Sequence, residues 1–181
     1  MVGIGAEAGL TMPVFVIAPL TLEEADATRI ATYRNAYDPH AAIVPPHVTL
    51  VFGLDDELEE KAIGRTRSTA AAFSSLALRY TRAAVTRDYE NSAWYLFAMP
   101  REMPAGLAEL HRRLNAGLSQ ETGFDGHTTL GRFRERILAD AVARDANDAG
   151  INIGAVIKAL TVVRFDGADV LSQVSIPLSG A

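Results

Sequence analysis

Two short stretches of this sequence carry a histidine and a threonine at the same spacing. His47-Val48-Thr49-Leu50 lies in the first third of the chain, and His127-Thr128-Thr129-Leu130 lies in the last third. On an extended strand, residues i and i+2 point to the same face and lie about 6–7 Å apart. Each stretch should therefore present an imidazole and a hydroxyl side by side, with Val48 or Thr128 turned to the opposite face.

Such a set of side chains suits the cleavage of a phosphodiester without a metal ion. One group must remove a proton from the attacking water, and a second must protonate the departing alkoxide. Histidine is the side chain best tuned to exchange protons near neutral pH. Two threonine hydroxyls can donate hydrogen bonds to the non-bridging phosphate oxygens and hold phosphorus between the imidazoles. The sequence thus predicts one active site that contains His47, Thr49, His127 and Thr129.

The elements that position these residues follow from periodicity and from turn and cap signals. We expect Thr21 to cap a helix whose Glu24 reaches back to the cap. The Asp166-Gly167 pair predicts a hairpin turn. The predicted strands are 14–18, 47–52, 76–87, 94–99, 127–133, 156–165 and 170–178, and the predicted helices are 21–35, 55–73, 105–119 and 135–148. In each half of the chain, a histidine-bearing strand is followed by a helix and then by a pair of strands.

Composition limits the classes of protein to which the chain can belong. The 181 residues are 49% hydrophobic, include no cysteine and carry a formal net charge of −5. The absence of cysteine excludes disulfides and thiolate chemistry, and net acidity argues against binding of duplex nucleic acid. No apolar segment approaches the roughly 20 residues of a membrane span. We expect a cytoplasmic monomer that acts on a small nucleotide or an RNA end, with no membrane partner.

The stretches VPPHVTLVFGL and FDGHTTLGRF resemble the paired motifs of the 2H phosphoesterase superfamily, which includes the bacterial 2′-5′ RNA ligase proteins and cyclic-phosphate hydrolases. The resemblance implies an α+β fold over residues 1–181, a single bilobal domain whose two pseudo-symmetric lobes carry antiparallel sheets flanking a central cleft. It implies no metal and no other cofactor. It also implies hydrolysis of a 2′,3′-cyclic phosphate or a related cyclic or 2′-5′ phosphodiester, with His127 as base and His47 as acid.

Further candidates surround the two motifs. The family often has a basic residue near Arg132, which makes Arg132 a candidate for a substrate phosphate, although strand alternation puts it on the face opposite His127. Phe52 and Phe133 are candidates to stack on a base, with burial in the core as the expectation for both. Tyr95 and Phe97 share a face of their strand, and one of them could line the cleft and contact substrate, with burial again the expectation. Asp125 either orients His127 or serves only its Asp-Gly turn.

Several alternatives stay open at this level. His40 is expected in a solvated loop, and His111 on the polar side of a helix. Two histidines with Asp125 could bind a metal, but threonine at both +2 positions is a poor ligand. A binding module that holds a nucleotide or RNA end without turnover, and a reversible 2′-5′ RNA ligase, would both use the same four residues.

Overall fold

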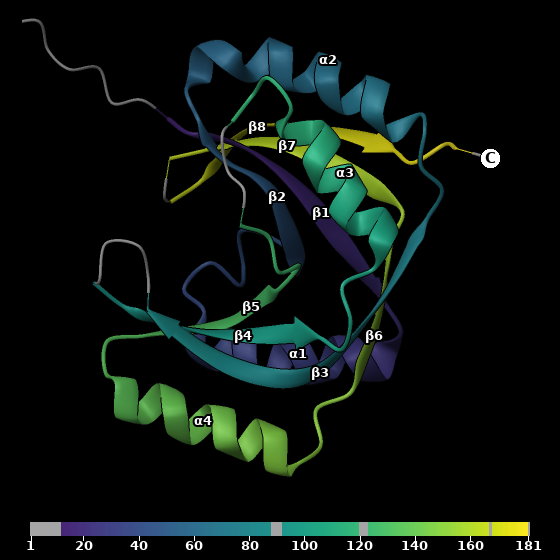
Figure 1. Cartoon of the computed structure of the whole chain (residues 1–181). Coiled ribbons are helices and arrows are strands. Elements are labelled where there is room, and N and C mark those ends of the chain that lie inside the picture. The colour runs from purple at the N-terminus through teal and green to yellow at the C-terminus, as the bar shows by residue number, and fades with distance from the viewer. Residues whose placement is uncertain (1–11, 88–91, 120–122, 167, 181) are drawn as a thin grey trace, which may run out of the picture.

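The structure, a computed structural model, describes residues 12–87, 92–119, 123–166 and 168–180. Its elements (Figure 1) are β1 (Val14–Leu22), α1 (Glu24–Tyr37), β2 (His47–Leu54), a 3₁₀ turn (Asp56–Leu58), α2 (Glu59–Ala70), β3 (Leu76–Arg87), β4 (Trp94–Pro100), α3 (Ala105–Asn115), β5 (Thr128–Phe133), α4 (Arg136–Asp148), β6 (Ile153–Ile157), β7 (Ala159–Phe165) and β8 (Val170–Pro177). No helix among these residues is long and apolar enough to span a membrane.

The strands form two lobes that share β1. Residues Val14–Pro19 of β1 lie between β2 and β7, and β8 follows β7, which together make the first lobe. Leu20–Leu22 of β1 pair with β6, which continues through β3 and β4 to β5 in the second lobe. Every pairing in the described part of the chain is antiparallel. The predicted α+β class with antiparallel sheets is confirmed.

The helices cover the lobes in an exchanged order. Helix α2 follows β2 and packs on β7 and β8 of the same lobe. Helix α4 follows β5 and packs on β3 and β4 of the same lobe. Helix α1, however, precedes β2 but packs on β5, whereas α3 precedes β5 but packs on β2 (Figure 1). The approach of α1 is so close that a Cβ on Gly131 would lie 2.7 Å from the Cβ of Tyr37. Strand β2 is thus held by α3, the helix before β5, and β5 is held by α1, the helix before β2.

One hydrophobic cluster runs through both lobes. The stripe predicted on the third helix is part of it, since Leu107, Leu110 and Leu114 are fully buried. The leucines that end the two motifs, Leu50 and Leu130, are fully buried as well. The apolar half of each motif therefore anchors its strand in the core.

Two predictions about element boundaries are wrong. Thr21 is not a helix cap but a residue of β1 that pairs with Val156, and the N-cap of α1 is Glu23. The predicted strand 156–165 is two strands separated at Lys158, because the chain crosses there from the second lobe to the first. Gly167 of the predicted hairpin lies outside the described residues, although β7 and β8 do pair as expected.

Candidate active site

The two motifs come together where β2 and β5 contact each other between the lobes. His47 and Thr49 are half-buried, and so are His127 and Thr129, whereas Thr128 is fully buried. The alternation predicted for both stretches is therefore present, although His127 immediately precedes β5 rather than opening it. The imidazoles are close enough for the charge of His127 to lower the pKa of His47.

A β-bulge follows the threonine in both motifs. On β2 the register with β1 shifts after Thr49, so that Leu50 is passed over in the pairing. On β5 the register with β4 shifts after Thr129, so that Leu130 is passed over in the same way. An extra residue of this kind bends a strand and redirects the side chains that come after it. At the first bulge, the Leu50 carbonyl accepts a hydrogen bond of 2.8 Å from the buried side chain of Asn115 on α3.

The bulge changes the predicted place of Arg132. Arg132 pairs with Tyr95 and Thr129 pairs with Phe97. Tyr95 and Phe97 share a face of β4, so Arg132 lies on the same face as Thr129. The prediction that Arg132 faces away from His127 is wrong, because simple alternation stops at the bulge.

Phe52 occupies the position in the first lobe that Arg132 occupies in the second, since each stands five residues after its motif histidine. Its side chain is 66% exposed and meets Phe15 edge to face, with ring centroids 5.2 Å apart. Burial of Phe52 in the core is therefore excluded, while Phe133 is buried as expected. Phe52 and Arg132 are the counterparts of each other in the two lobes, one aromatic and one cationic.

A stack of rings leads from His127 toward Arg132. The His127 ring lies 3.7 Å from the Phe97 ring at an interplanar angle of 20°, and Phe97 stacks on Tyr95 at 5.6 Å. The Arg132 guanidinium carbon lies 5.6 Å from the centre of the Tyr95 ring, within the range of a cation–π contact. Tyr95 is thus half-buried, and the ring of Phe97 separates it from the histidine. Sequence reasoning placed Phe97 on the same face as Tyr95, and the structure puts its ring directly against the ring of His127.

A carboxylate holds the imidazole of His127. Nδ1 of His127 bonds to the carboxylate of Asp125, and this hydrogen bond holds the pKa of Asp125 below its usual range. The intervening Gly126 has a positive φ of 64°, and its carbonyl accepts a bond of 3.3 Å from the hydroxyl of buried Tyr80. Asp125 therefore fulfils both predicted roles, since it sits in the turn and contacts the histidine.

A backbone carbonyl holds the imidazole of His47 instead. The Pro45 carbonyl can only accept, so Nδ1 of His47 donates to it at 2.8 Å and Nε2 carries the lone pair of the neutral ring. Burial lowers the pKa of His47, and the positive charge of Arg34 acts in the same direction, whereas the Pro45 carbonyl and Asp38 oppose the change. The two histidines thus share a spacing but not an electrostatic environment.

A buried ion pair fixes the loop before His47. Arg34 Nε donates to the carboxylate of Asp38 at 2.8 Å, and the two side chains are only 5% and 6% exposed. The same guanidinium donates to the Val44 carbonyl at 2.7 Å. Sequence reasoning missed this pair, although Arg34 and Asp38 stand four residues apart at the end of the helix that leads to the motif.

The remaining histidines lie outside this arrangement. His111 is buried rather than on the surface, and its ring stacks on Phe124 at 4.1 Å. His40 is in a loop as predicted but only half exposed, because it meets Phe165 edge to face. Within the described ranges, no three His, Asp or Glu side chains are grouped as ligands of a metal ion.

Comparison with known proteins identifies the family. The model of the 2′-5′ RNA ligase superfamily matches residues 22–169. A curated protein of Geobacillus sp. (strain WCH70) named "Putative phosphoesterase" is 34% identical over 106 residues, which are 56% of this chain and 59% of the relative. A Geobacillus kaustophilus protein of the same name is 33% identical over the same shares of both chains. The match thus spans about three fifths of the length of each relative.

Solved structures share the fold at low sequence identity. Usb1 of Kluyveromyces marxianus superposes with a TM-score of 0.60 at 14% identity, covering 93% of this chain and 99% of Usb1. LigT of E. coli, complexed with 3′-AMP, gives a TM-score of 0.56 at 19% identity over 92% of this chain and 98% of LigT. With the family model covering most of the sequence, this chain belongs to the 2′-5′ RNA ligase superfamily, the group of 2H phosphoesterases.

Proposed function

We propose that this protein is a phosphoesterase that hydrolyses a 2′,3′-cyclic phosphate, or a related small cyclic or 2′-5′ phosphodiester, without a metal ion. The observation that carries the proposal is the contact of β2 with β5, the strands of the two His-x-Thr motifs, which come from opposite lobes. Binding alone would not require two proton-transfer groups. Two imidazoles on opposing strands can instead serve the two sides of one phosphorus atom.

The reaction needs one water and no other reactant. The water oxygen attacks phosphorus while the bond from phosphorus to one ribose oxygen breaks. His127 takes the proton of the water, and His47 gives a proton to the leaving ribose oxygen, so that a phosphomonoester is formed. The hydroxyls of Thr49 and Thr129 donate hydrogen bonds to the non-bridging oxygens, where negative charge grows in the transition state.

The environments of the two rings differ in how they favour a bound proton. The carboxylate of Asp125, bonded to Nδ1, stabilises the positive charge that forms on His127 when that ring accepts a proton. Burial lowers the pKa of His47, which makes its protonated form the stronger proton donor. The protonated form of His47 is thus the stronger acid but holds the smaller share at neutral pH, so the assignment of His127 as base and His47 as acid rests on the resemblance to the family.

The ligands of the structural neighbours support a nucleotide substrate. LigT of E. coli has been solved with 3′-AMP, and Usb1 of Kluyveromyces marxianus with uridine monophosphate. Both ligands are small nucleotides. The acidic net charge of −5 also favours a small substrate over long nucleic acid.

A turnover screen tests the proposal. Nucleoside 2′,3′-cyclic phosphates, RNA with a cyclic-phosphate end and 2′-5′ oligonucleotides are incubated with the protein in excess chelator, with controls to which zinc or manganese is returned. We expect turnover with chelator present. Loss of turnover that added metal restores would overturn the metal-independent mechanism, and tight binding with no turnover of any substrate would identify a binding module.

Variants of the two histidines separate their roles. His47→Ala and His127→Ala should each lower kcat/KM by about 10²-fold or more, because each removes an acid or a base. A deoxynucleoside p-nitrophenyl phosphodiester has a leaving group that needs no proton, so it should restore the rate of His47→Ala relative to wild type but not that of His127→Ala. Rescue of the opposite variant would reverse the assignment, and a near-normal rate for either variant on its cyclic substrate would refute the mechanism.

A further inference from the structure

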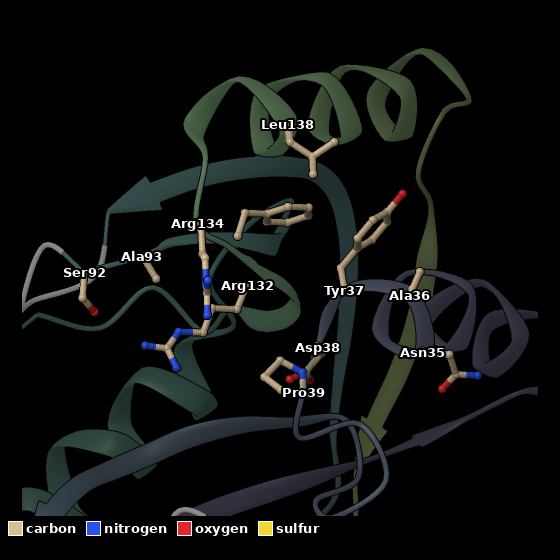
Figure 2. Close-up of a pocket in the computed structure, with 11 residues that line it drawn as sticks. Asn35, Ala36, Tyr37, Asp38, Pro39, Ser92, Ala93, Arg132, Arg134 and Leu138 are labelled. Carbon is tan, nitrogen blue, oxygen red and sulfur yellow. The ribbon is translucent and has the colours of Figure 1, made fainter.

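A cavity of about 760 Å³ opens beside the proposed catalytic face. It lies between the end of α1, the end of β5 and the start of α4 (Figure 2). We call it the arginine pocket, because Arg132 and Arg134 line it together with Tyr37, Phe133 and Leu138. Its volume is within the 300–1,000 Å³ that is usual for sites of small ligands.

The lining of the arginine pocket combines cations with flat apolar groups. Figure 2 shows Arg132 and Arg134 on the same side of the pocket, across from Tyr37. Tyr37 and Phe133 meet with ring centroids 5.0 Å apart, and Leu138 of α4 is 49% exposed although it is apolar. Arginine is suited to phosphate and to the face of a base, and aromatic rings are suited to stacking with a base.

One carboxylate also lines the pocket, but its charge is already matched. Asp38 accepts hydrogen bonds from Arg34 Nε at 2.8 Å and from the backbone N–H of His40 at 3.0 Å. Its side chain is buried against this pair. Asp38 therefore brings no uncompensated negative charge to the pocket. The guanidinium of Arg134 favours an anionic ligand there, despite the acidic balance of the whole chain.

The arginine pocket is continuous with the catalytic face but too far from it for one phosphate to reach both. Arg132 belongs to the pocket and also to the ring stack that ends at His127. Arg134 stands seven residues beyond His127, with the whole of β5 between the two residues. A ligand that engages both His127 and Arg134 must therefore be longer than a cyclic phosphate with its ribose.

We propose that the arginine pocket binds the nucleotide that precedes the cyclic-phosphate end, so that the substrate is the end of an RNA of at least two nucleotides rather than a mononucleotide. This inference rests on the proposed function. The preceding base packs against the apolar lining, and the phosphate that joins the two nucleotides pairs with the arginines.

The test compares a dinucleotide that ends in a 2′,3′-cyclic phosphate with the corresponding mononucleotide. The wild-type protein should prefer the dinucleotide in kcat/KM by about 10-fold or more, the size expected for one charge-assisted phosphate contact. Arg134→Gln and Leu138→Glu should each lower that preference, chiefly through KM for the dinucleotide. Leu138 is half exposed, so the glutamate brings a repelling charge to the pocket without disturbing the core.

Two matched variants serve as controls. Ile137→Glu introduces the same charge at the neighbouring position of α4, where the side chain is 77% exposed and does not line the pocket. Arg144→Gln removes an exposed arginine farther along the same helix. Both should keep the preference of the wild type.

The outcomes separate this inference from the proposed function. Equal kcat/KM for the two substrates in the wild-type protein, or equal loss of preference in Leu138→Glu and Ile137→Glu, would overturn the arginine pocket as a subsite while leaving hydrolysis intact. Failure to turn over either substrate would instead refute the proposed function.

Discussion

The two motifs repeat the same residue types, but the groups that hydrogen-bond to their imidazoles differ. His47 donates to the carbonyl of Pro45, a neutral acceptor, whereas His127 bonds to the carboxylate of Asp125. A carboxylate stabilises an imidazolium far more than a carbonyl does. Two copies of one motif can thus take different roles in proton transfer, because the residues before them, Pro45 and Asp125, differ.

The charge of Asp125 can be removed without changing the size of the side chain. The pKa of Asp125 is lowered by its bond to His127, so the carboxylate is ionised at neutral pH. In Asp125→Asn the imidazolium loses this partner. We expect kcat/KM to fall by about 10-fold or more, because the positive charge that forms on the ring in the transition state is no longer stabilised. The exposed Asp145→Asn on α4 is the control, and an unchanged kcat/KM in Asp125→Asn would contradict the role of the carboxylate.

Adjacent threonines on β5 offer a matched pair of substitutions. Thr129 shares a face with His127, whereas the hydroxyl of Thr128 is buried and finds no hydrogen-bond partner among the described residues. Thr129→Val should lower kcat/KM by about 10²-fold, as the loss of one donor to the phosphate. Thr128→Val should keep kcat/KM and raise or preserve the melting temperature, since valine needs no partner. Equal kinetics for the two variants would count against the phosphate contact.

At the scale of elements, a side chain near the end of α1 holds the loop between α1 and β2. The guanidinium of Arg34 reaches the carboxylate of Asp38 and the carbonyl of Val44. Val44 stands next to Pro45, whose carbonyl orients His47. The end of α1 thereby fixes the start of β2 across the intervening turn.

Breaking this pair should destabilise the fold and displace His47. Arg34→Met leaves the Asp38 carboxylate buried without its cation, and we expect the free energy of unfolding to fall by about 3–5 kcal/mol in urea titrations. Arg29→Met removes the cation of an exposed pair on the same helix and should cost less than about 1 kcal/mol. If the double variant Arg34→Met/Asp38→Leu regains stability, the unpaired carboxylate causes the loss of unfolding free energy in Arg34→Met. If the double variant is no more stable than Arg34→Met, the lost hydrogen bonds to backbone carbonyls cause that loss.

The sequence predicted what depends on neighbours along the chain. The spacing of His47 and Thr49 on a strand, and the Asp125-Gly126 turn, are local, and the structure contains them. The bulges are not local, because the carbonyl freed at Leu50 is satisfied by Asn115, 65 residues away. Arg132 was assigned to the wrong face for this reason. The burial of His111 under Phe124 likewise depends on a contact that helical periodicity does not report.

At the scale of the whole molecule, the exchange of α1 and α3 ties the stability of each lobe to the other. Each helix precedes the motif strand of one lobe in the sequence and packs on the motif strand of the other lobe. We expect a single unfolding transition in urea. The only tryptophan, Trp94, lies on β4 in the second lobe, so its fluorescence should change at the same urea concentration as the circular dichroism of both lobes. Fluorescence that changes at a different concentration would contradict this coupling.

Strand β1 runs through both lobes without interruption, pairing with β2 and β7 near its start and with β6 near its end. A rotation of one lobe against the other would have to bend this strand and break its ladder on one side. Within the described residues, the lobes are therefore joined by a continuous strand rather than by a loop of the kind that serves as a hinge. We expect the distance between the two motifs to be set by the fold of β1 and to change little when a ligand binds.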